Sequence, residues 1–386
     1  MSPRSKLSAP SAARPARQPK VVIVHDWLVG GGAERVVEQL HKLYPGAPIY
    51  TSYCTREWRR RLDGRVRTGF LQWWPLGRLR KFLPVLRIWW FSHLDLREYD
   101  LVISSSSAEA KGVTRLSPTA VHINYCHAPT HYYWSRYNEY LARPGFGFFD
   151  PLARVGLKLL VGPLRKWDYK AAQRPDVIIA NSTHIKEQIQ RYYDRAAAVI
   201  CPPVDTTRFT TTTSNKKRRG FVIAGRQTPY KRFDLAIVAC SKLNAPLTVI
   251  GDGPEHRRLR KLAGKSVTFL GRVSDEVVAE EFASARALIF PGLDDFGITP
   301  VEAMAAGTPV IAYQAGGALD YVIAGKTGLF FTEPTARSLA GALRKFPSQP
   351  FDHAEIARAA ERFSARQFRR KFQLLVKKVL VGPTDR

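Results

Sequence analysis

Two carboxylates, Asp294 and Glu302, stand eight positions apart in the second half of the chain. Asp294 belongs to the loop that follows the apolar run 287–290, and Glu302 belongs to the start of the next predicted helix. Both side chains can therefore face one ligand at the edge of a sheet. Glu302 also has a structural explanation, because Thr299 and Glu302 form the pattern of a capping box with Pro300 at the first helical position.

Two loops carry groups that suit a phosphate. Gly31 and Gly32 lie between the first apolar run and a predicted helix, where backbone amides can approach an anion at the positive end of that helix. A tight turn with no ligand is the alternative. Arg226 and Lys231 follow the apolar run 221–224, and two cations at that edge can neutralise a diphosphate without a metal ion. The alternative for this pair is a solvated basic loop.

His127 and Asp275 are further candidates at the ends of predicted strands. His127 follows the apolar run 120–125, and a histidine in that place more often satisfies a structural hydrogen bond than it contacts a ligand. Asp275 ends the loop 271–275. Its carboxylate can either accept hydrogen bonds from a ligand or cap the next helix.

The elements that must position these residues are short apolar runs that alternate with helical stretches from residue 20 onward. This alternation predicts an α/β fold with parallel, doubly wound sheets. Asn181 and Ser182 are candidate caps for a helix that runs to Tyr192. The predicted strands are 21–24, 101–104, 120–125, 177–180 and 199–201 in the first half, and 221–224, 247–250, 267–270, 287–290, 310–312 and 329–331 in the second.

The length of 386 residues predicts two domains. We expect a disordered basic tail at 1–19, a first domain at 20–205 and a second domain at 220–354. The polar segment 206–219, with four consecutive threonines and four consecutive basic residues, is predicted to be the linker. The last segment, 355–386, is helical and amphipathic, and we expect it to cross back onto the first domain.

Composition excludes several classes of protein. The chain has no uncharged apolar run of about 18 residues, no apolar signal region and no CxxC pair among its four cysteines. We therefore expect no membrane span, no export and no zinc site, and a reducing cytoplasm as the location. The formal net charge of +28 by itself permits nucleic acid, anionic lipid or a phosphorylated substrate as the partner.

The segment 56–97 holds eleven basic and three acidic residues, interleaved with aromatic side chains. Cations and aromatic rings together are typical of a membrane interface. We predict that this segment rests on the anionic inner surface of a membrane; the alternative is that its aromatic residues form the core of the first domain. The residues expected to contact lipid are Trp73, Trp74, Arg78, Arg80, Lys81, Arg87, Trp89 and Trp90.

The sequence from Asp294 to Gly307 resembles the acidic motif of the retaining GT-B glycosyltransferases of family four, which has Glu at both ends where this chain has Asp first. The resemblance covers nearly the whole chain from Lys20. It is strongest for the mannosyltransferases of O-antigen and exopolysaccharide assembly. The segments that match in order are Gly30–Glu34, Tyr125–Pro129, Asn181–Ser182, Pro202–Asp205, Gly225–Lys231, Gly251–Pro254 and Gly316–Gly317.

The resemblance implies a GT-B fold, in which two Rossmann-like domains face a central cleft. The first domain, 20–205, would lie on the acceptor side, and the second, 220–354, would bind the nucleotide sugar. The resemblance also implies roles for the candidate residues. Glu302 would bind the ribose of the donor, and Asp294 and His127 would contact the transferred sugar. Asp294 is shorter than the family's Glu by one methylene, about 1.5 Å, which leaves the sugar's identity open. Arg226 and Lys231 would hold the diphosphate. Asp275 matches the loop that holds the base in this family, where its carboxylate could accept hydrogen bonds from the N1 and N2 groups of guanine. The remaining donor-binding positions would be Gly31, Gly32, Gly297, Ile298 and Thr299.

The function implied is transfer of a hexose with retention, most of all mannose from GDP-mannose, to a glycan or polyprenyl diphosphate-linked acceptor. UDP-sugars and GDP-fucose are alternative donors. We expect no metal, no further cofactor and no nucleic-acid partner, and a peripheral position on the cytoplasmic face of the membrane. Two competing interpretations are a nucleic-acid-binding protein, for which the net charge argues, and an inactive GT-B module, for which Asp294 argues.

Overall fold

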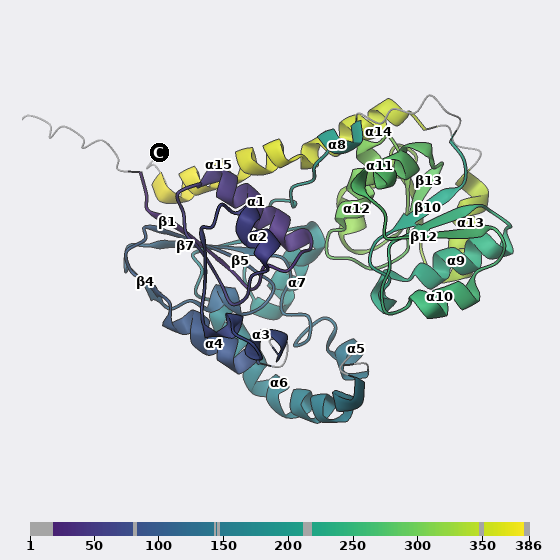
Figure 1. Cartoon of the computed structure of the whole chain (residues 1–386). Coiled ribbons are helices and arrows are strands. Elements are labelled where there is room, and N and C mark those ends of the chain that lie inside the picture. The colour runs from purple at the N-terminus through teal and green to yellow at the C-terminus, as the bar shows by residue number, and fades with distance from the viewer. Residues whose placement is uncertain are drawn as a thin grey trace, which may run out of the picture.

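The computed structural model describes residues 18–79, 83–142, 144, 147–210, 218–346 and 351–381. These residues form two α/β lobes joined along one side, with a long C-terminal helix that reaches from the second lobe over the first (Figure 1). The fold is therefore the two-domain, parallel-sheet architecture expected from the sequence, and the C-terminal crossing is confirmed.

The first domain is built on a seven-stranded sheet in which every neighbouring pair is parallel. Its order is β3-β2-β1-β5-β7-β8-β9, and a separate parallel pair joins β4 to β6. The short strands β2, β3, β4 and β6 were not predicted. The bounds are β1 (Val21–His25), β2 (Ile49–Thr51), β3 (Val66–Thr68), β4 (Asp95–Leu96), β5 (Leu101–Ser106), β6 (Arg115–Leu116), β7 (Val121–Cys126), β8 (Val177–Ala180) and β9 (Ala198–Val199).

Helices cover both faces of this sheet because successive strand residues point to opposite faces and both sets are apolar. Ile23 and Ile103 pack with α1 and α2 on one face, and Val22 and Val102 pack with α4 on the other. Ser182 caps α7, as predicted, by accepting a hydrogen bond from the amide of Ile185. The helices are α1 (Gly32–Leu43), α2 (Arg56–Arg61), α3 (Leu76–Leu79), α4 (Pro84–His93), α5 (Tyr137–Ala142), α6 (Asp150–Ala172) and α7 (Thr183–Tyr193).

The second domain has a six-stranded parallel sheet in the order β12-β11-β10-β13-β14-β15, and all six of its predicted strands are confirmed. Helices α8, α11, α12 and α14 pack on one face, and α9, α10 and α13 pack on the other. The strands are β10 (Phe221–Ala224), β11 (Leu247–Ile250), β12 (Val267–Gly271), β13 (Ala287–Phe290), β14 (Val310–Tyr313) and β15 (Gly328–Phe331). The helices are α8 (Thr207–Thr210), α9 (Phe233–Lys242), α10 (His256–Leu262), α11 (Asp275–Ser284), α12 (Ile298–Ala305), α13 (Ala336–Lys345) and α14 (His353–Ala360).

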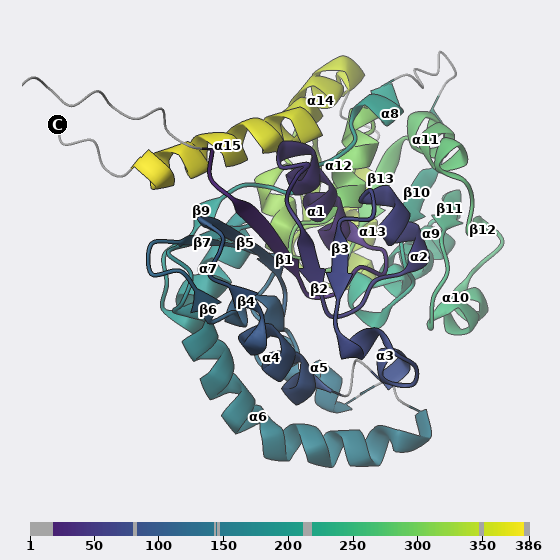
Figure 2. The ribbon, with the colours of Figure 1, turned by 60° about the vertical axis from the view of Figure 1, so that its left-hand side comes forward.

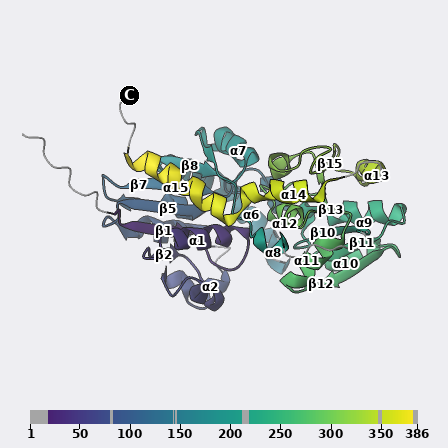
Figure 3. The ribbon, with the colours of Figure 1, turned by 90° about the horizontal axis from the view of Figure 1, so that it is seen from above.

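The chain crosses between the domains twice, and the two crossings lie side by side. The amide of Val204 donates to the carbonyl of Phe363, and the amide of Ala365 donates to the carbonyl of Val204. Beyond this point α15 (Ala365–Val381) packs Phe368 and Phe372 into the core of the first domain, whereas α14 stays on the second (Figure 3).

The first crossing lies before the segment 206–219 that we expected to be the linker. Phe209 of α8 is buried in the core of the second domain, and Arg218 donates to the carbonyl of Ala306 in the same domain. Residues 211–217, like residues 1–17 of the expected tail, lie outside the described part of the chain. The segment 355–386 also differs from the prediction of one helix, because α14 ends at Ala360 and α15 begins at Ala365.

Both sheets reverse their strand order at the edge that faces the other domain. In the first sheet the reversal lies between β1 and β5, and in the second it lies between β10 and β13. In open α/β sheets this reversal opens a crevice beyond the carboxyl ends of the two strands. The loops after these strands carry Gly31, Lys231 and Asp294, so the topology alone directs three predicted site residues toward the space between the domains.

The basic, aromatic segment 56–97 is divided between the core and the surface, which corrects part of the membrane prediction. Arg87 is buried and forms an ion pair with Glu109 at 2.8 Å, and Trp90 packs in the core, so neither can contact lipid. Trp73 and Trp74 are 70% and 76% exposed. Arg80 and Lys81, and the side chain of Arg78, lie outside the described residues.

A second exposed apolar surface was not predicted and lies on the first half of α6. This helix contains Pro163, which cannot donate a helical hydrogen bond, and it is curved where it runs beneath the first domain (Figure 2). Before Pro163 most of its large apolar side chains are solvent-exposed, and after it Leu164 and Asp168 are buried. Among the described residues, no helix combines the length and apolar character needed to cross a bilayer. The exposed apolar residues at this end are Phe148, Phe149, Leu152, Val155, Leu159 and Leu160.

Candidate active site

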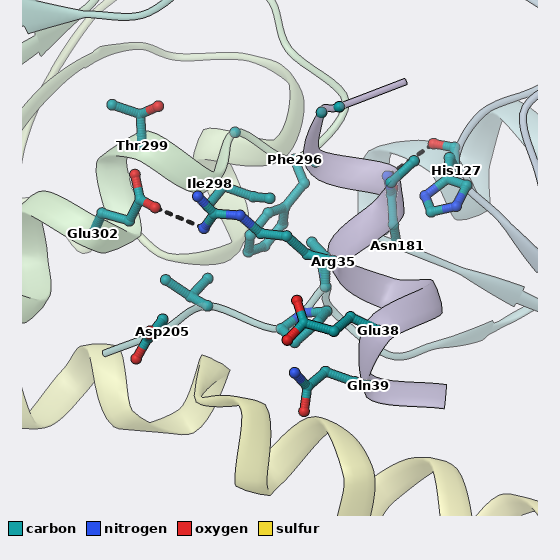
Figure 4. Close-up of a pocket in the computed structure, with 18 of the residues that line it drawn as sticks. Arg35, Glu38, Gln39, His127, Asn181, Asp205, Phe296, Ile298, Thr299 and Glu302 are labelled. Atoms are coloured by element: carbon teal, nitrogen blue, oxygen red, sulfur yellow. Dashed lines mark hydrogen bonds and ion pairs between the residues drawn. The ribbon is translucent and has the colours of Figure 1, made fainter. Parts of the chain in front are cut away.

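A cleft of about 1030 Å³ lies between the domains, and residues from both line it (Figure 4). From the first domain come the loop before α1, one face of α1 and the segment after β7. From the second come the loops after β10 and β13 and the start of α12. The structure brings together ten of the eleven predicted site residues in this cleft: Gly31, Gly32, His127, Lys231, Asp275, Asp294, Gly297, Ile298, Thr299 and Glu302.

The glycine loop before α1 is held in place by Glu34. This carboxylate is buried and accepts hydrogen bonds from the amides of Gly30, at 2.9 Å, and Val29, at 3.2 Å. Glu34 lies in the first turn of α1, so these bonds hold the loop against its own helix. Gly31 and Gly32 line the cleft at the positive end of α1. The loop geometry is therefore suited to an anion.

His127 lines the cleft from the end of β7 as a neutral imidazole. Its Nε2 lies 2.8 Å from the hydroxyl of Ser105, and the amide of Asn181 donates to its carbonyl at 2.8 Å. Burial, with a smaller effect of His25, lowers the pKa of His127 to about 3. A neutral imidazole can donate one hydrogen bond and accept another, which suits contact with sugar hydroxyls.

The segment after His127 is anchored by a buried carboxylate, Asp168 on α6, that sequence reasoning missed. Asp168 is fully buried and carries four hydrogen-bond or ion-pair partners, so its charge is compensated. These contacts fix the chain between β7 and α5. The partners are Lys111 at 2.6 Å, Thr130 at 2.9 Å, Trp134 at 2.7 Å and Tyr193 at 2.7 Å.

Lys231 and Asp294 face each other across the strand reversal of the second sheet. The Nζ of Lys231 lies 2.7 Å from Oδ2 of Asp294. Burial opposes the charge of Lys231, but the Asp294 carboxylate outweighs it and raises the pKa of the ammonium group. Gly316 and Gly317 pack closely against the loop that carries Asp294. A Cβ on Gly316 would lie 2.6 Å from the carbonyl oxygen of Asp294. That close approach explains the pair of glycines in the motif.

Glu302 does not belong to a capping box, so the structural role that the sequence offered for Thr299 and Glu302 is wrong. Helix α12 begins at Ile298 with Gly297 as its N-cap, and no side chain caps it. Gly297 has φ +83°, a conformation that glycine adopts readily. Thr299 and Pro300 therefore lie inside the first turn, where the missing amide of proline costs no helical hydrogen bond. Glu302 directs its carboxylate into the cleft and accepts a hydrogen bond from Arg35 of the first domain at 2.7 Å (Figure 4).

Asp275 lies at the rim of a second, smaller pocket of about 320 Å³ that adjoins the cleft. It is the first residue of α11, whose N-cap is Ser274, so the predicted capping role is wrong. Its Oδ2 instead lies 2.5 Å from Nη1 of Arg208 on α8. The walls of the smaller pocket include Gly225, Gly251 and Arg272, which follow three neighbouring strands of the second sheet.

Arg226 is the predicted site residue that the structure does not bring to the cleft. Its side chain is exposed, and it lines neither pocket. Gly225, the residue before it, lines the smaller pocket, and Lys231 lines the larger one. The expected pair of cations is therefore separated in this structure, with Lys231 inside the cleft and Arg226 outside it.

Further contacts that involve cleft-lining residues also join the domains, and they were not predicted from the sequence. His131 lies 2.8 Å from the carboxylate of Asp295, and the Ser182 hydroxyl donates to the carbonyl of Asp295 at 2.5 Å. Burial opposes the charge of Asp295, but His131 and Arg136 outweigh it and lower the pKa of this carboxyl group. Within the described ranges, no cluster of three or more His, Cys, Asp or Glu side chains is arranged to hold a metal ion.

Arg35 was also missed, although a pattern in the sequence could have found it. Gly32, Arg35, Gln39 and Lys42 follow the 3.6-residue period of one helix face, and all four line the cleft. The glycine loop directs the start of this helix at the cleft, so the polar face that continues from Gly32 would be expected to line it. A polar helix face usually lies in solvent, which is why the pattern alone did not point to a site.

Two family models match the chain in succession. The model described as Glycosyltransferase Family 4 matches residues 30–208, and the model described as Glycosyl transferases group 1 matches residues 204–363. Their junction coincides with the first crossing between the domains, at Val204. Together the matches include the cleft-lining residues from Gly30 to Glu302.

Curated relatives and solved structures agree with these matches. The α-1,3/1,6-mannosyltransferase of Dictyostelium discoideum is 34% identical over 119 residues, which is 29% of this chain and 28% of the relative. The GDP-mannose-dependent α-mannosyltransferase of Mycolicibacterium smegmatis is 36% identical over 111 residues, 28% of this chain and 29% of the relative. The alignments thus span less than a third of either enzyme. The Anabaena protein HepE, solved in complex with UDP-glucose, superposes with a TM-score of 0.65 at 19% identity over 93% of this chain and all of HepE.

Proposed function

The chain is built from the two domains of a GT-B glycosyltransferase, and on that premise we propose that it transfers a hexose from a nucleotide diphosphate sugar to an acceptor. The observation that carries the proposal is the convergence of Gly31 and His127 from the first domain with Lys231, Asp294 and Glu302 from the second in one cleft. Each group has the chemistry that one part of such a donor needs.

The donor lies with its base in the smaller pocket and its diphosphate and sugar in the larger one. Glu302 lines both pockets, so its carboxylate accepts the ribose hydroxyls between them. Lys231 and the amides at the start of α1 bind the diphosphate. Asp294 and the neutral His127 contact hydroxyls of the hexose.

Transfer begins as the bond between the anomeric carbon and the diphosphate breaks. Negative charge grows on the leaving phosphate, so Lys231 and the positive end of α1 stabilise the transition state more than the ground state. The acceptor hydroxyl attacks on the face that the phosphate leaves, and its proton passes to the leaving phosphate oxygen. This course retains the anomeric configuration.

We propose mannose as the sugar and GDP as the nucleotide. The support is the similarity to two mannosyltransferases, one of them named as GDP-mannose-dependent. Asp275 at the rim of the base pocket offers a carboxylate to the N1 and N2 groups of guanine. A UDP-sugar is the alternative donor, since the structurally similar HepE was solved with UDP-glucose.

The acceptor proposed is a glycan or a polyprenyl diphosphate-linked sugar at an anionic membrane surface. Trp73 and Trp74, just before α3, are exposed, and the first half of α6 carries exposed apolar side chains. Helices α3 and α6 lie at the same end of the first domain, which supports this position (Figures 1 and 2). Basic residues accompany the apolar face, with Arg154 and Lys158 on α6 itself. We therefore assign lipid contact to this surface and not to Arg87 and Trp90, which are buried.

A thermal-shift panel with GDP, UDP, ADP and single-stranded DNA tests the proposal. Stabilisation by one nucleoside diphosphate at low concentration supports the enzyme and identifies the base. Stabilisation by DNA alone supports a nucleic-acid-binding protein instead. A protein that binds the diphosphate but neither hydrolyses nor transfers from GDP-mannose or UDP-glucose would be an inactive GT-B module, the alternative that Asp294 in place of Glu favours.

A further inference from the structure

Arg35 and Glu302 form an ion pair that bridges the two domains across the cleft. Arg35 projects from α1 of the first domain, Glu302 projects from α12 of the second, and Nη1 lies 2.7 Å from Oε1 (Figure 4). They are 267 positions apart in the chain. The contact therefore exists only because the domains face each other.

The pair stands at the boundary between the two pockets. Five residues line both the larger and the smaller pocket, and Arg35 and Glu302 are among them; the others are Arg208, Asp275 and Thr299. A ligand that fills both pockets must pass these residues. For a nucleotide sugar with its base in the smaller pocket, the part that passes is the ribose and the first phosphate.

Arg35 and a ribose would both use the Glu302 carboxylate as a hydrogen-bond acceptor. A carboxylate only accepts hydrogen bonds, and both a guanidinium group and ribose hydroxyls donate them. The side chain of Glu302 is 9% exposed, so few other directions are open to a donor. A ribose that binds Glu302 must therefore displace Arg35 or share the carboxylate with it.

A displaced Arg35 would lie beside the donor's phosphates. Its guanidinium group is always charged. In the same cleft Lys231 is already paired with Asp294, and Arg226 does not line the cleft. Guanidinium groups bind phosphate in bidentate fashion, more strongly than a partly exposed ion pair between side chains. The exchange of Glu302 for a phosphate is thus favourable for Arg35.

We propose that Arg35 is a donor-binding residue of the first domain that the ribose displaces from Glu302 and that then pairs with the donor's diphosphate. This inference rests on the proposed function, since it requires a nucleotide in the cleft. The guanidinium group of Arg35 would then place a positive charge from the first domain beside the leaving diphosphate. It would also couple nucleotide binding to the position of α1, because the same side chain contacts the second domain before binding and the ligand after it.

Binding of nucleosides and nucleoside diphosphates, measured by calorimetry, tests the exchange. The probes are guanosine with GDP and uridine with UDP, and the variants are Arg35→Ala, Arg35→Lys and the control Lys42→Ala. Lys42 lines the same cleft from the same helix but pairs with Glu38 of its own helix at 3.0 Å. Each alanine variant removes one positive charge from α1, and only Arg35→Ala removes the contact with Glu302.

The Arg35→Ala variant should bind the nucleoside about threefold more tightly, because nothing competes for Glu302, and the diphosphate about tenfold more weakly. The preference for diphosphate over nucleoside should thus fall about thirtyfold, less in Arg35→Lys, and should stay near the wild-type value in Lys42→Ala. An unchanged preference in Arg35→Ala, or equally tighter binding of both ligands, would overturn the proposal. Wild-type protein that binds none of the four probes would defeat the proposed function itself, a separate result.

Discussion

Lys231 Nζ lies 2.7 Å from Asp294 Oδ2, so the cation proposed to hold the diphosphate is bonded to the carboxylate proposed to contact the sugar. Both side chains are largely buried, and the Asp294 carboxylate raises the pKa of Lys231. Lys231 is therefore charged throughout the physiological pH range. A donor that binds between them would receive a positive group and an acceptor group from adjacent loops.

The two predicted phosphate cations should differ in importance. Lys231→Ala should lower kcat/KM roughly ten- to hundredfold, because a charge-assisted bond to phosphate contributes about 1.5–3 kcal/mol. Arg226→Ala should change it by less than about twofold, since its side chain lines neither pocket. Initial rates with GDP-mannose or UDP-glucose measure both. Equal losses in the two variants would restore Arg226 to the diphosphate site.

Glu302→Gln should separate binding from stability. Glutamine keeps the shape and offers Arg35 a neutral acceptor, so the free energy of unfolding should change by no more than about 1 kcal/mol. Nucleoside diphosphate binding should weaken about tenfold or more, because the ribose hydroxyls lose an anionic acceptor. Urea denaturation and calorimetry supply the two values. If stability and binding fell together, the main purpose of Glu302 would be to join the domains.

Protein stability should decline as the pH falls below about 6.5. Burial, with a smaller effect of Arg174, lowers the pKa of His122 to about 3, and burial likewise lowers that of His127 to about 3. The unfolded chain binds protons from pH 6.5 downward that the folded chain excludes, so each histidine contributes stability that is present above pH 6.5 and lost toward pH 3. The slope is at most about 1.4 kcal/mol per pH unit for each.

Urea denaturation of the wild type and of His122→Asn at pH 7.5, 6.5 and 5.5 checks this expectation. The variant should lose less stability than the wild type between the upper and lower pH, because it lacks one of the two excluded protons. Identical slopes would mean that His122 does not titrate between the folded and unfolded states as its burial implies.

Vesicle binding should depend on the exposed apolar face of α6. Leu152 and Leu159 are 70% and 72% exposed, and replacing both with Gln should weaken binding to vesicles of phosphatidylcholine and phosphatidylglycerol about tenfold. Binding should require the anionic lipid and fall with added salt, since each basic residue near the surface contributes about 1 kcal/mol. Replacing Arg78, Arg80 and Lys81 together with Ser should weaken it further.

The matched control for this experiment is Leu374→Gln on α15, a similarly exposed leucine on a helix of the other side of the first domain. It should leave vesicle co-sedimentation unchanged. A wild-type protein that fails to sediment with anionic vesicles at low ionic strength would refute the membrane seat and make a soluble acceptor the better expectation.

The sequence by itself determined the order of the elements and the loops that carry chemistry. The six strands of the second domain were predictable because short apolar runs bounded by glycine or polar loops are a local signal. Parallel sheets then place the loops after β1, β10 and β13, which carry Gly31, Lys231 and Asp294, at the crevice of their own sheet. That the crevices of the two sheets form one site was implied only by the family resemblance, and the structure shows it. The short strands β2 and β3, each three residues long, carry too little pattern to be predicted.

Only the tertiary structure decided which partner each charged residue has. Arg87 was expected at the lipid surface and is instead buried with Glu109, and Glu302 was a candidate helix cap and instead pairs with Arg35 of the other domain. Arg226 and Lys231, five positions apart, differ in that one is exposed and the other lines the cleft. The reason is physical: the partners of a charged side chain depend on which surfaces the fold brings within a few ångströms, and these pairs come from segments that no local periodicity links.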